Sequence, residues 1–461
     1  MSKKDNMAMM SEQPIHTVLF KMSLPIMISF FIQAMYNIVD SMFVARISEN
    51  ALTAVSLAFP MQQIVTAIAV GTSVGVSALW SRYMGMGDRE KASRHIRTMT
   101  AMSLGFTFLF ILLGVFASGP LFRAQTDVAE IAEMGTTYLT INWVLSCGSI
   151  FSKYYERLLV SAGSPVLSMV TMICGAVFNL VFDPLLIFGL GPFPAMGIAG
   201  AAYATVGGQI FSAIVAIALN RKHIEAVKHD ILRPAFHADA AIGILRVGMP
   251  SIITMGLSSL TSFFINQILL VYSTTATAVY GVWMKLQNFC FMPIFGLNSG
   301  MVAILGYNYG RKRIDRVNQT MKLAIMVSAG LMSLLLVILE IIPGAILTMF
   351  SAGEQMRLIG MACLRTCVIS LPFAAVSMIF SSSMQALDHS RYALFINLLR
   401  QCVLLIAGFA LLSAITHSQQ LIWLAVPIVE IVTFAVAAVL YRRFLNHLGI
   451  TGARQSQPRK P

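Results

Sequence analysis

The chain has 461 residues, of which 57% are hydrophobic and 11% are charged, and its formal net charge is +13. Soluble domains carry roughly 25% charged residues, so this composition excludes most soluble classes. Apolar runs near or above the ~18 to 20 residues that cross a bilayer as a helix recur along the whole length. The sequence therefore predicts an all-α integral membrane protein.

In chain order we expect about twelve transmembrane helices, by the length and hydropathy criteria for membrane spans. Their predicted centres lie near residues 30, 66, 106, 146, 177, 207, 256, 290, 331, 371, 402 and 432.

The basic residues are distributed unevenly along this topology. If the N-terminus is cytoplasmic, 26 of the 32 Lys and Arg residues fall on cytoplasmic segments. Outer loops carry Arg46, Arg123 and Arg357, and the spans carry Lys285, Arg365 and Arg400. This bias follows the positive-inside rule and places both termini in the cytoplasm. The positive charge thus indicates topology, and we expect no nucleic-acid partner.

An internal repeat divides the chain into two halves. A constant offset of 225 residues aligns Pro25 with Pro250, Gly71 with Gly296, Gly75 with Gly300, and Gly85 with Gly310. We expect a cytoplasmic tail (1–14), a first lobe of six helices (15–220), a cytoplasmic linker (221–241), a second lobe of six helices (242–445) and a C-terminal cytoplasmic tail (446–461). Because six is even, the two lobes are parallel and related by a pseudo-two-fold axis along the membrane normal, as in some secondary transporters.

Two aspartates stand inside spans of the first lobe. A charged residue at the centre of a membrane helix costs ~2.5 to 3.5 kcal/mol, so such residues usually face a cavity and mark an ion or substrate path. Asp40 shares a helix face with Gln33 and Tyr36 at helical spacing. Asp183 lies one turn after Asn179 and directly before Pro184, which removes a backbone donor and bends the helix.

The depths of these aspartates in the membrane match, so we expect them to meet. Two adjacent carboxylates in a low dielectric cannot both stay ionised, and such a pair can take up a proton or hold Na⁺. The alternative places Asp40 at the water interface and Asp183 against broken helix backbone, without coupling. The offset of 225 maps the pair to Ile265 and Gly408, so the second lobe lacks it.

The second lobe has intramembrane charges of its own. Lys285 and Glu430 lie at matched depth, so an ion pair between them is plausible, either for substrate selection or as a structural contact. Arg400 lies deeper, and either a structural partner or a cavity-lining role is open. The sequence shows no metal cluster, nucleophile or phosphate-binding loop, so we expect neither a cofactor nor an enzyme.

Several long segments resemble one transporter family. These are "KMSLPIMISFFIQAMYNIVDSMFVARI" in the first span, "GVSALWSRYMGMGDREKA" after the second, and the region with the pattern N-x-x-x-D-P around Asp183. Over about residues 15 to 445 the chain is similar to the multidrug and toxic compound extrusion (MATE) family, in particular its bacterial MepA-like and DinF-like branch.

The resemblance implies roles for particular residues. Asp40 and Asp183 would bind the proton or Na⁺, with Asn179, Tyr36 and, in the fourth span, Tyr138 as polar partners. Pro25 would be the point at which the first helix bends.

The resemblance also implies a function. We expect export of cationic, amphipathic compounds from the bacterial inner membrane, in exchange for H⁺ or Na⁺ and by alternating access. We further expect a monomer. The alternative is a flippase for lipid-linked precursors, which would need a more cationic cavity; Lys285 and Arg400 keep that alternative open.

Overall fold

The structure is a computed structural model that describes residues 5–228, 230, 233–349, 353–416, 418 and 420–447. The described residues form helices and connecting turns. Most of the predicted C-terminal tail and the first four residues of the predicted N-terminal tail lie outside the described residues.

The described residues of the first half form nine α-helices. They are α1 (Asp5–Glu12), α2 (Ile15–Ala45), α3 (Glu49–Met86), α4 (Arg89–Phe116), α5 (Ser118–Gln125), α6 (Ala129–Val144), α7 (Cys147–Ser161), α8 (Pro165–Phe188) and α9 (Ile198–His223). A short 3-10 helix, η1 (Glu225–Val227), leads to the second half.

The second half repeats this plan. It contains α10 (Ala238–Leu270), α11 (Thr274–Gly310), α12 (Ile314–Ile341), α13 (Pro343–Met349), α14 (Glu354–Val368), α15 (Leu371–Ala386), α16 (Ser390–Leu398), α17 (Leu405–Thr416) and α18 (Ala425–His447). A π-helix, η2 (Leu399–Leu404), joins α16 to α17, and a 3-10 helix, η3 (Leu421–Leu424), precedes α18.

Within the described residues, ten helical segments are long and apolar enough to cross a membrane, and α14 with α15 forms an eleventh that is bent by 44°. The span predicted near residue 146 falls on α6 and α7, of 16 and 15 residues. Each is shorter than the ~20 residues that a membrane-spanning helix needs. Three charged residues, Lys153, Glu156 and Arg157, also lower the hydropathy of α7.

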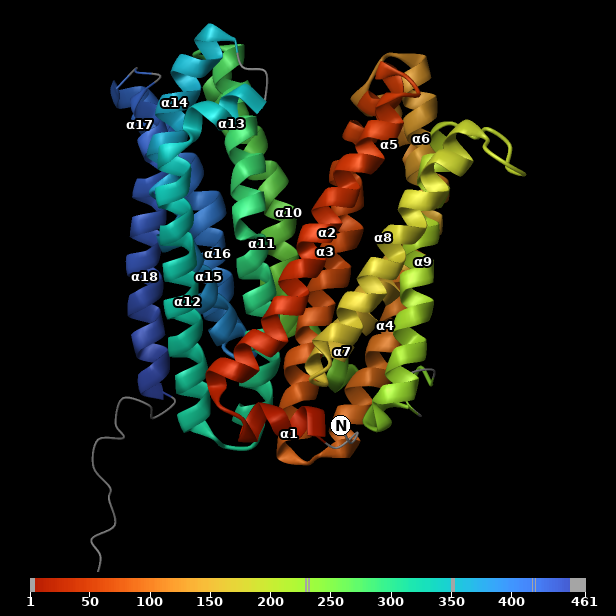
Figure 1. The fold of residues 1–461 in the computed structure, drawn as a ribbon, viewed down its shortest axis with the longest axis vertical. Coiled ribbons are helices and arrows are strands. Elements are labelled where there is room, and N and C mark those ends of the chain that lie inside the picture. The colour runs from red at the N-terminus through yellow and green to blue at the C-terminus, as the bar shows by residue number, and fades with distance from the viewer. Residues whose placement is uncertain are drawn as a thin grey trace, which may run out of the picture.

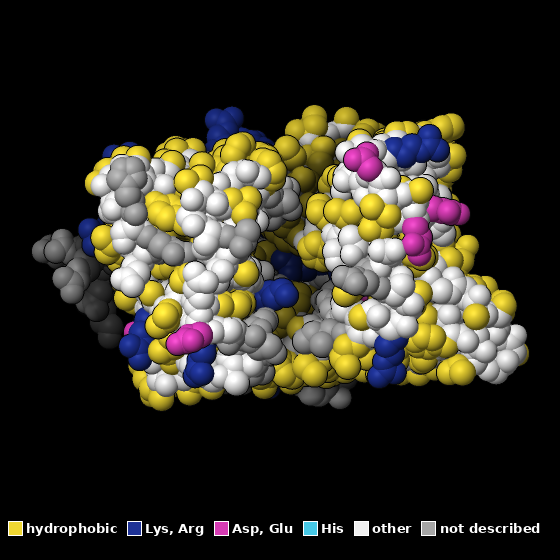
Figure 2. All heavy atoms as spheres, turned by 90° about the horizontal axis from the view of Figure 1, so that it is seen from above, with side chains coloured by type: hydrophobic (Ala, Val, Ile, Leu, Met, Phe, Trp, Pro, Cys, Tyr) yellow, Lys and Arg dark blue, Asp and Glu magenta, His cyan; other side chains and the backbone are white. Residues whose placement is uncertain are grey.

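The helices form two bundles that meet at one end and diverge at the other (Figure 1). The N-terminal end of the described chain lies at the joined end, and α5 and α13 lie at the diverging end (Figure 1). Seen from the diverging end, a hollow separates the two bundles, and Lys and Arg side chains are visible within it (Figure 2).

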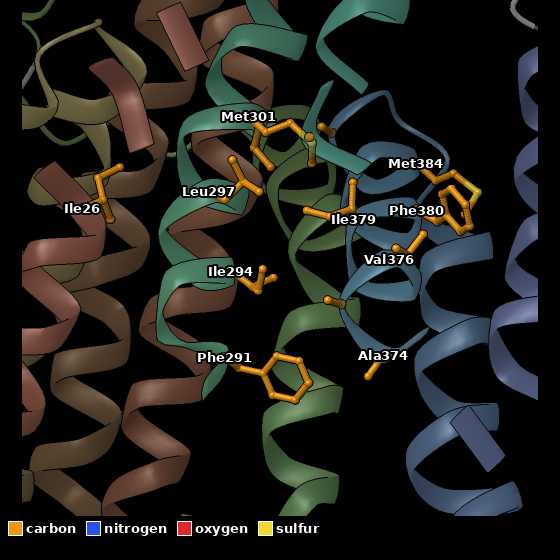
Figure 3. Close-up of a cluster of buried hydrophobic side chains, with 14 of the residues drawn as sticks. Ile26, Phe291, Ile294, Leu297, Met301, Ala374, Val376, Ile379, Phe380 and Met384 are labelled. Carbon is orange, nitrogen blue, oxygen red and sulfur yellow. The ribbon is translucent and has the colours of Figure 1, made fainter. Parts of the chain in front are cut away.

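Two helices link the bundles. The first part of α2 packs against α11 and α12 of the second half, and the helix also packs along α8 of the first half. In the same way, α10 packs against α3 and α4 and then against α16 and α17. Buried side chains of α11, among them Phe291, Leu297 and Met301, face α15, and Ile26 of α2 lies on the other side of α11 (Figure 3).

The glycines of the internal repeat lie where helices of the two halves come close together. A Cβ atom at Gly75 of α3 would stand 2.2 Å from the carbonyl oxygen of Ile244 in α10. A Cβ atom at the repeat-related Gly300 of α11 would stand 2.7 Å from the Ser23 hydroxyl of α2. Because these distances are shorter than ordinary contacts, glycine allows the helices of the two halves to pack this closely.

Candidate ion-coupling site

The structure brings Asp40 and Asp183 together. Asp40 lies near the end of α2 and Asp183 on α8, two helices that pack along each other. Asp183 is 0% exposed, Asp40 is half-buried, and their carboxyl groups lie within hydrogen-bonding reach of each other. One carboxylate oxygen of Asp40 is buried and accepts no hydrogen bond from the described residues. A shared proton or a bound cation would satisfy that oxygen.

Polar side chains from α8 and α9 complete the surroundings of Asp183. Asn179 Nδ2 lies 3.3 Å from Asp183 Oδ1 and 3.5 Å from Thr205 Oγ1 of α9. Either orientation of the amide lets its nitrogen donate to the Asp183 carboxylate. Asn179 therefore holds Asp183 in place. The side-chain oxygens of Asn179 and Thr205 are neutral ligands of the kind that suit Na⁺ or hydronium.

The two tyrosines occupy different sides of this site. Tyr138 of α6 is 3% exposed, and its hydroxyl hydrogen-bonds to the side chains of Gln62 and Thr205. It thus touches the site through Thr205. Tyr36, one turn before Asp40 on α2, hydrogen-bonds to Gln33 and lies closer to α7.

Both prolines stand inside helices that continue past them. Pro25 lies within α2 and Pro184 within α8. Each proline leaves the carbonyl four residues earlier without its helical donor. For Pro184, that freed carbonyl belongs to Leu180, one turn before the Asp183–Pro184 pair.

A polar pocket extends from this site into the first bundle. Helices α2, α7, α8 and α9 line it with Ser29, Gln33, Tyr36, Ser152, Lys153, Glu156, Met172, Gly175, Ala176, Asn179, Thr205, Gly208, Gln209 and Ser212. Asn179 lines this pocket and also donates to Asp183, so the pocket lies next to the aspartate pair.

Sequence reasoning missed the charged residues of this pocket. Lys153 Nζ lies 3.5 Å from Glu156 Oε2, and the Ser212 hydroxyl donates to Glu156 Oε1 at 2.9 Å. Glu156 is 6% exposed. The sequence prediction counted Lys153 and Arg157 among the cytoplasmic residues, because it ended the fourth span too early. The spacing of three between Lys153 and Glu156 on one helix face was the available signal for an internal pair.

In the second half, the predicted pairing of Glu430 needs correction. Glu430 of α18 is 4% exposed, and both of its carboxylate oxygens accept from Arg400 Nε, at 2.8 and 2.9 Å. Arg400, and not the predicted Lys285, is therefore its ion-pair partner. Arg400 lies on the π-helix η2, whereas Lys285 lies on an exposed face of α11. Matched depth did not identify the partner, because depth leaves the direction of a side chain around its helix undetermined.

Comparison with known proteins decides the family. The family model described as MatE matches the chain twice, over residues 25–185 and 250–411. The chain belongs to the MATE family. The two matched segments begin 225 residues apart, which is the offset of the internal repeat. MATE proteins are transporters and not enzymes, so this chain is a membrane transporter of small molecules.

Curated MATE relatives match over nearly the whole chain. The FAD transporter of Shewanella oneidensis is 26% identical over 98% of this chain and 99% of its own length. The multidrug export protein MepA of Staphylococcus haemolyticus is 24% identical over 98% of both chains. MepA of Staphylococcus aureus is 22% identical over 95% of this chain and 96% of its own length.

Solved structures show the same MATE fold. A MATE crystal structure in complex with MaL6 has a TM-score of 0.88 at 23% identity, covering 95% of this chain and 98% of that chain. A transporter from Pyrococcus furiosus, described as having a binding pocket of reverse polarity, has a TM-score of 0.87 at 22% identity, with the same coverage.

Proposed function

We propose that this MATE transporter exports small organic molecules across a bacterial inner membrane in exchange for H⁺ or Na⁺, and that Asp40 and Asp183 bind the coupling ion. The observation that carries this proposal is the meeting of two carboxyl groups from separate helices at a site shielded from lipid. Loading the pair with a proton or Na⁺ removes the repulsion between the carboxylates. It thereby changes the preferred packing of α2 against α8.

The orientation of the chain follows from its charges. The basic segments 81–94 and 306–319 lie at the ends of α3 and α11, which belong to the joined end of the bundles. The positive-inside rule places that end, and with it both termini, in the cytoplasm. The hollow in Figure 2 then opens to the outside, and the described conformation is outward-facing.

Two carboxyl groups also suit the energetics of exchange. One elementary charge that moves through 100 mV is worth ~2.3 kcal/mol, so export of a monovalent cation cancels the electrical gain of one entering proton. A one-to-one exchange would then use the pH gradient alone, at ~1.4 kcal/mol per unit. An aspartate pair that carries more than one positive charge inward per exported cation would let the exchange also use the membrane potential.

The relatives suggest two classes of substrate. Cationic amphipathic compounds are the first candidate, supported by the multidrug export proteins at 22% and 24% identity. FAD or a similar anionic dinucleotide is the second, supported by the FAD transporter at 26% identity and by basic side chains in the hollow. Both candidates use the same coupling site.

Transport in proteoliposomes tests the coupling site. We expect imposed pH or Na⁺ gradients to drive ethidium or FAD, and we expect Asp183→Asn and Asp40→Asn to lose at least tenfold of the gradient-driven rate. Asp127→Asn, in an exposed loop, is the matched control and should keep the wild-type rate. Gradient-driven transport at the wild-type rate in both site variants would refute the assignment.

A further inference from the structure

Arg157 is a cation that the coupling mechanism does not use. It lies on α7 and donates through one terminal nitrogen to the hydroxyl of Ser299 on α11, in the other half of the molecule. Its Nε is buried and has no hydrogen-bond partner among the described residues. Within the same residues no carboxylate forms an ion pair with it, whereas Lys153 and Arg400 each have one.

Such an arrangement is energetically incomplete. A charge that is removed from water costs several kcal/mol unless an opposite charge and further hydrogen bonds compensate it. A neutral hydroxyl supplies only one acceptor, although a guanidinium group offers five donors. Among the described residues, the half-buried Arg157 thus has donors from which an anion could accept hydrogen bonds.

Arg157 lies where α7 meets α11, at a contact between the two halves. The next turn of α7 carries Ser161, whose hydroxyl lies 2.6 Å from that of Ser77 on α3. Ser299 precedes Gly300, the glycine at which α11 packs closely on α2. Arg157 and Ser299 therefore meet from opposite halves, one turn from the α7–α3 contact of Ser161 and beside the α11–α2 contact at Gly300. An amphipathic molecule in the hollow would reach them with its polar end.

We propose that Arg157 and Ser299, with Lys153 one turn away on α7, form a subsite for the phosphate group of an amphipathic substrate. The planar guanidinium fork matches two phosphate oxygens. The Ser299 hydroxyl, which donates to the Phe295 carbonyl oxygen, accepts from Arg157 and orients the guanidinium group. Lys153 shares the helix face of Arg157 at a spacing of four residues, and its ion pair with Glu156 leaves Arg157 as the uncompensated charge of this face. This inference rests on the proposed export function, and it narrows the substrate to phosphate-bearing molecules.

The test compares two probes that differ by one phosphate, FMN and riboflavin. Their binding to the purified full-length chain in detergent is measured by flavin fluorescence. We expect the wild type to bind FMN at least tenfold more tightly than riboflavin. Arg157→Gln should abolish this preference and leave riboflavin binding unchanged, and Arg157→Lys should keep part of it. Arg123→Gln, an exposed arginine at the open end, is the matched control and should keep the full preference.

Two results would overturn the subsite: equal binding of FMN and riboflavin by the wild type, or an undiminished preference in Arg157→Gln. If Arg157→Gln does not fold, Ser299→Ala and Arg157→Lys decide, because both should weaken FMN binding and spare riboflavin binding. Undecaprenyl phosphate as competitor separates the sources of the phosphate. Displacement of FMN by this lipid, but not by undecaprenol, indicates a lipid-borne phosphate, and failure to displace FMN indicates a soluble one.

The outcome is separable from that of the coupling proposal. Asp183→Asn should lose gradient-driven transport and still prefer FMN over riboflavin. If the wild type shows gradient-driven transport but no preference for FMN, the phosphate subsite is wrong and the coupling site stands. If it prefers FMN but the aspartate variants keep gradient-driven transport, the coupling site is wrong and the subsite stands.

Discussion

A close contact between the two halves, that of Gly75 with Ile244, predicts a shift in conformational equilibrium. Adding a single methyl group in Gly75→Ala would place Cβ 2.2 Å from the carbonyl oxygen of Ile244. The Cβ atom is fixed directly on the backbone of α3, and the oxygen belongs to the backbone of α10, so the two helices must move apart to restore an ordinary contact. Overpacking of this kind costs typically ~1 to 3 kcal/mol. The cost applies only while the cytoplasmic end is closed.

This cost sets the size of the shift. Because ~1.4 kcal/mol corresponds to a factor of ten, Gly75→Ala should lower the ratio of outward-facing to inward-facing molecules about fivefold to hundredfold. The higher helix propensity of alanine, roughly 0.5 to 1 kcal/mol, acts on both conformations and cancels in the ratio.

Pulsed electron paramagnetic resonance measures that ratio directly. Spin labels at Arg89→Cys and Arg313→Cys, both exposed at the cytoplasmic ends of α4 and α12, report the separation of the halves in a background without native cysteines. Gly75→Ala should populate a longer distance than the parent protein does. Gly105→Ala is the control, because a Cβ atom there meets nothing within 4 Å. An unchanged distance distribution in Gly75→Ala would show that this contact does not hold the cytoplasmic end closed.

Two further predictions concern charges away from the coupling site. Arg400→Met should lower the melting temperature in detergent, because an unpaired buried Glu430 costs ~3 to 5 kcal/mol. Adding Glu430→Met should restore most of the lost stability. An Arg400→Met variant as stable as the wild type would contradict this prediction. Asp88 caps α4, where the Lys91 backbone N–H and then the Lys91 ammonium hold its pKa below the usual range. Its stabilisation should be present at neutral pH and lost as the pH falls through that lowered pKa. Asp88→Ala should therefore speed amide exchange in the first turn of α4 at pH 7, and equal exchange in both proteins would argue against the cap.

Counting residues along the helices was enough to predict the depth of each aspartate in the membrane. That depth was enough to predict that Asp40 and Asp183 meet. An α-helix rises by a constant 1.5 Å per residue, so Asp40 and Asp183 could be placed at one level of the membrane from the sequence alone. The repeat offset likewise picked out Gly75 and Gly300, which the structure places at the corresponding contacts between the halves.

Direction around a helix could not be obtained in the same way. Glu430 pairs with Arg400, which lies on a π-helix, where the residues per turn differ from those of an α-helix and shift the face that each side chain occupies. The interruption between α6 and α7 had a similar effect. The chain continues here as two short helices, and Lys153 and Arg157 therefore lie on α7, with Lys153 lining the polar pocket, instead of in a cytoplasmic loop.

The two halves share a backbone plan but differ in their chemistry, and this difference assigns a mechanical role to α2. The aspartate pair occurs in the first half and has no counterpart in the second, since the repeat equivalents of Asp40 and Asp183 are Ile265 and Gly408. The contacts that must open on the cytoplasmic side involve both halves. Helix α2 carries Asp40 near its C-terminal end and packs on α11 of the other half near its N-terminal end. An ion that changes the packing of Asp40 against α8 can therefore act along α2 on the α2–α11 contact, which includes Ser23 and Met27 on either side of Pro25, the point of least backbone support.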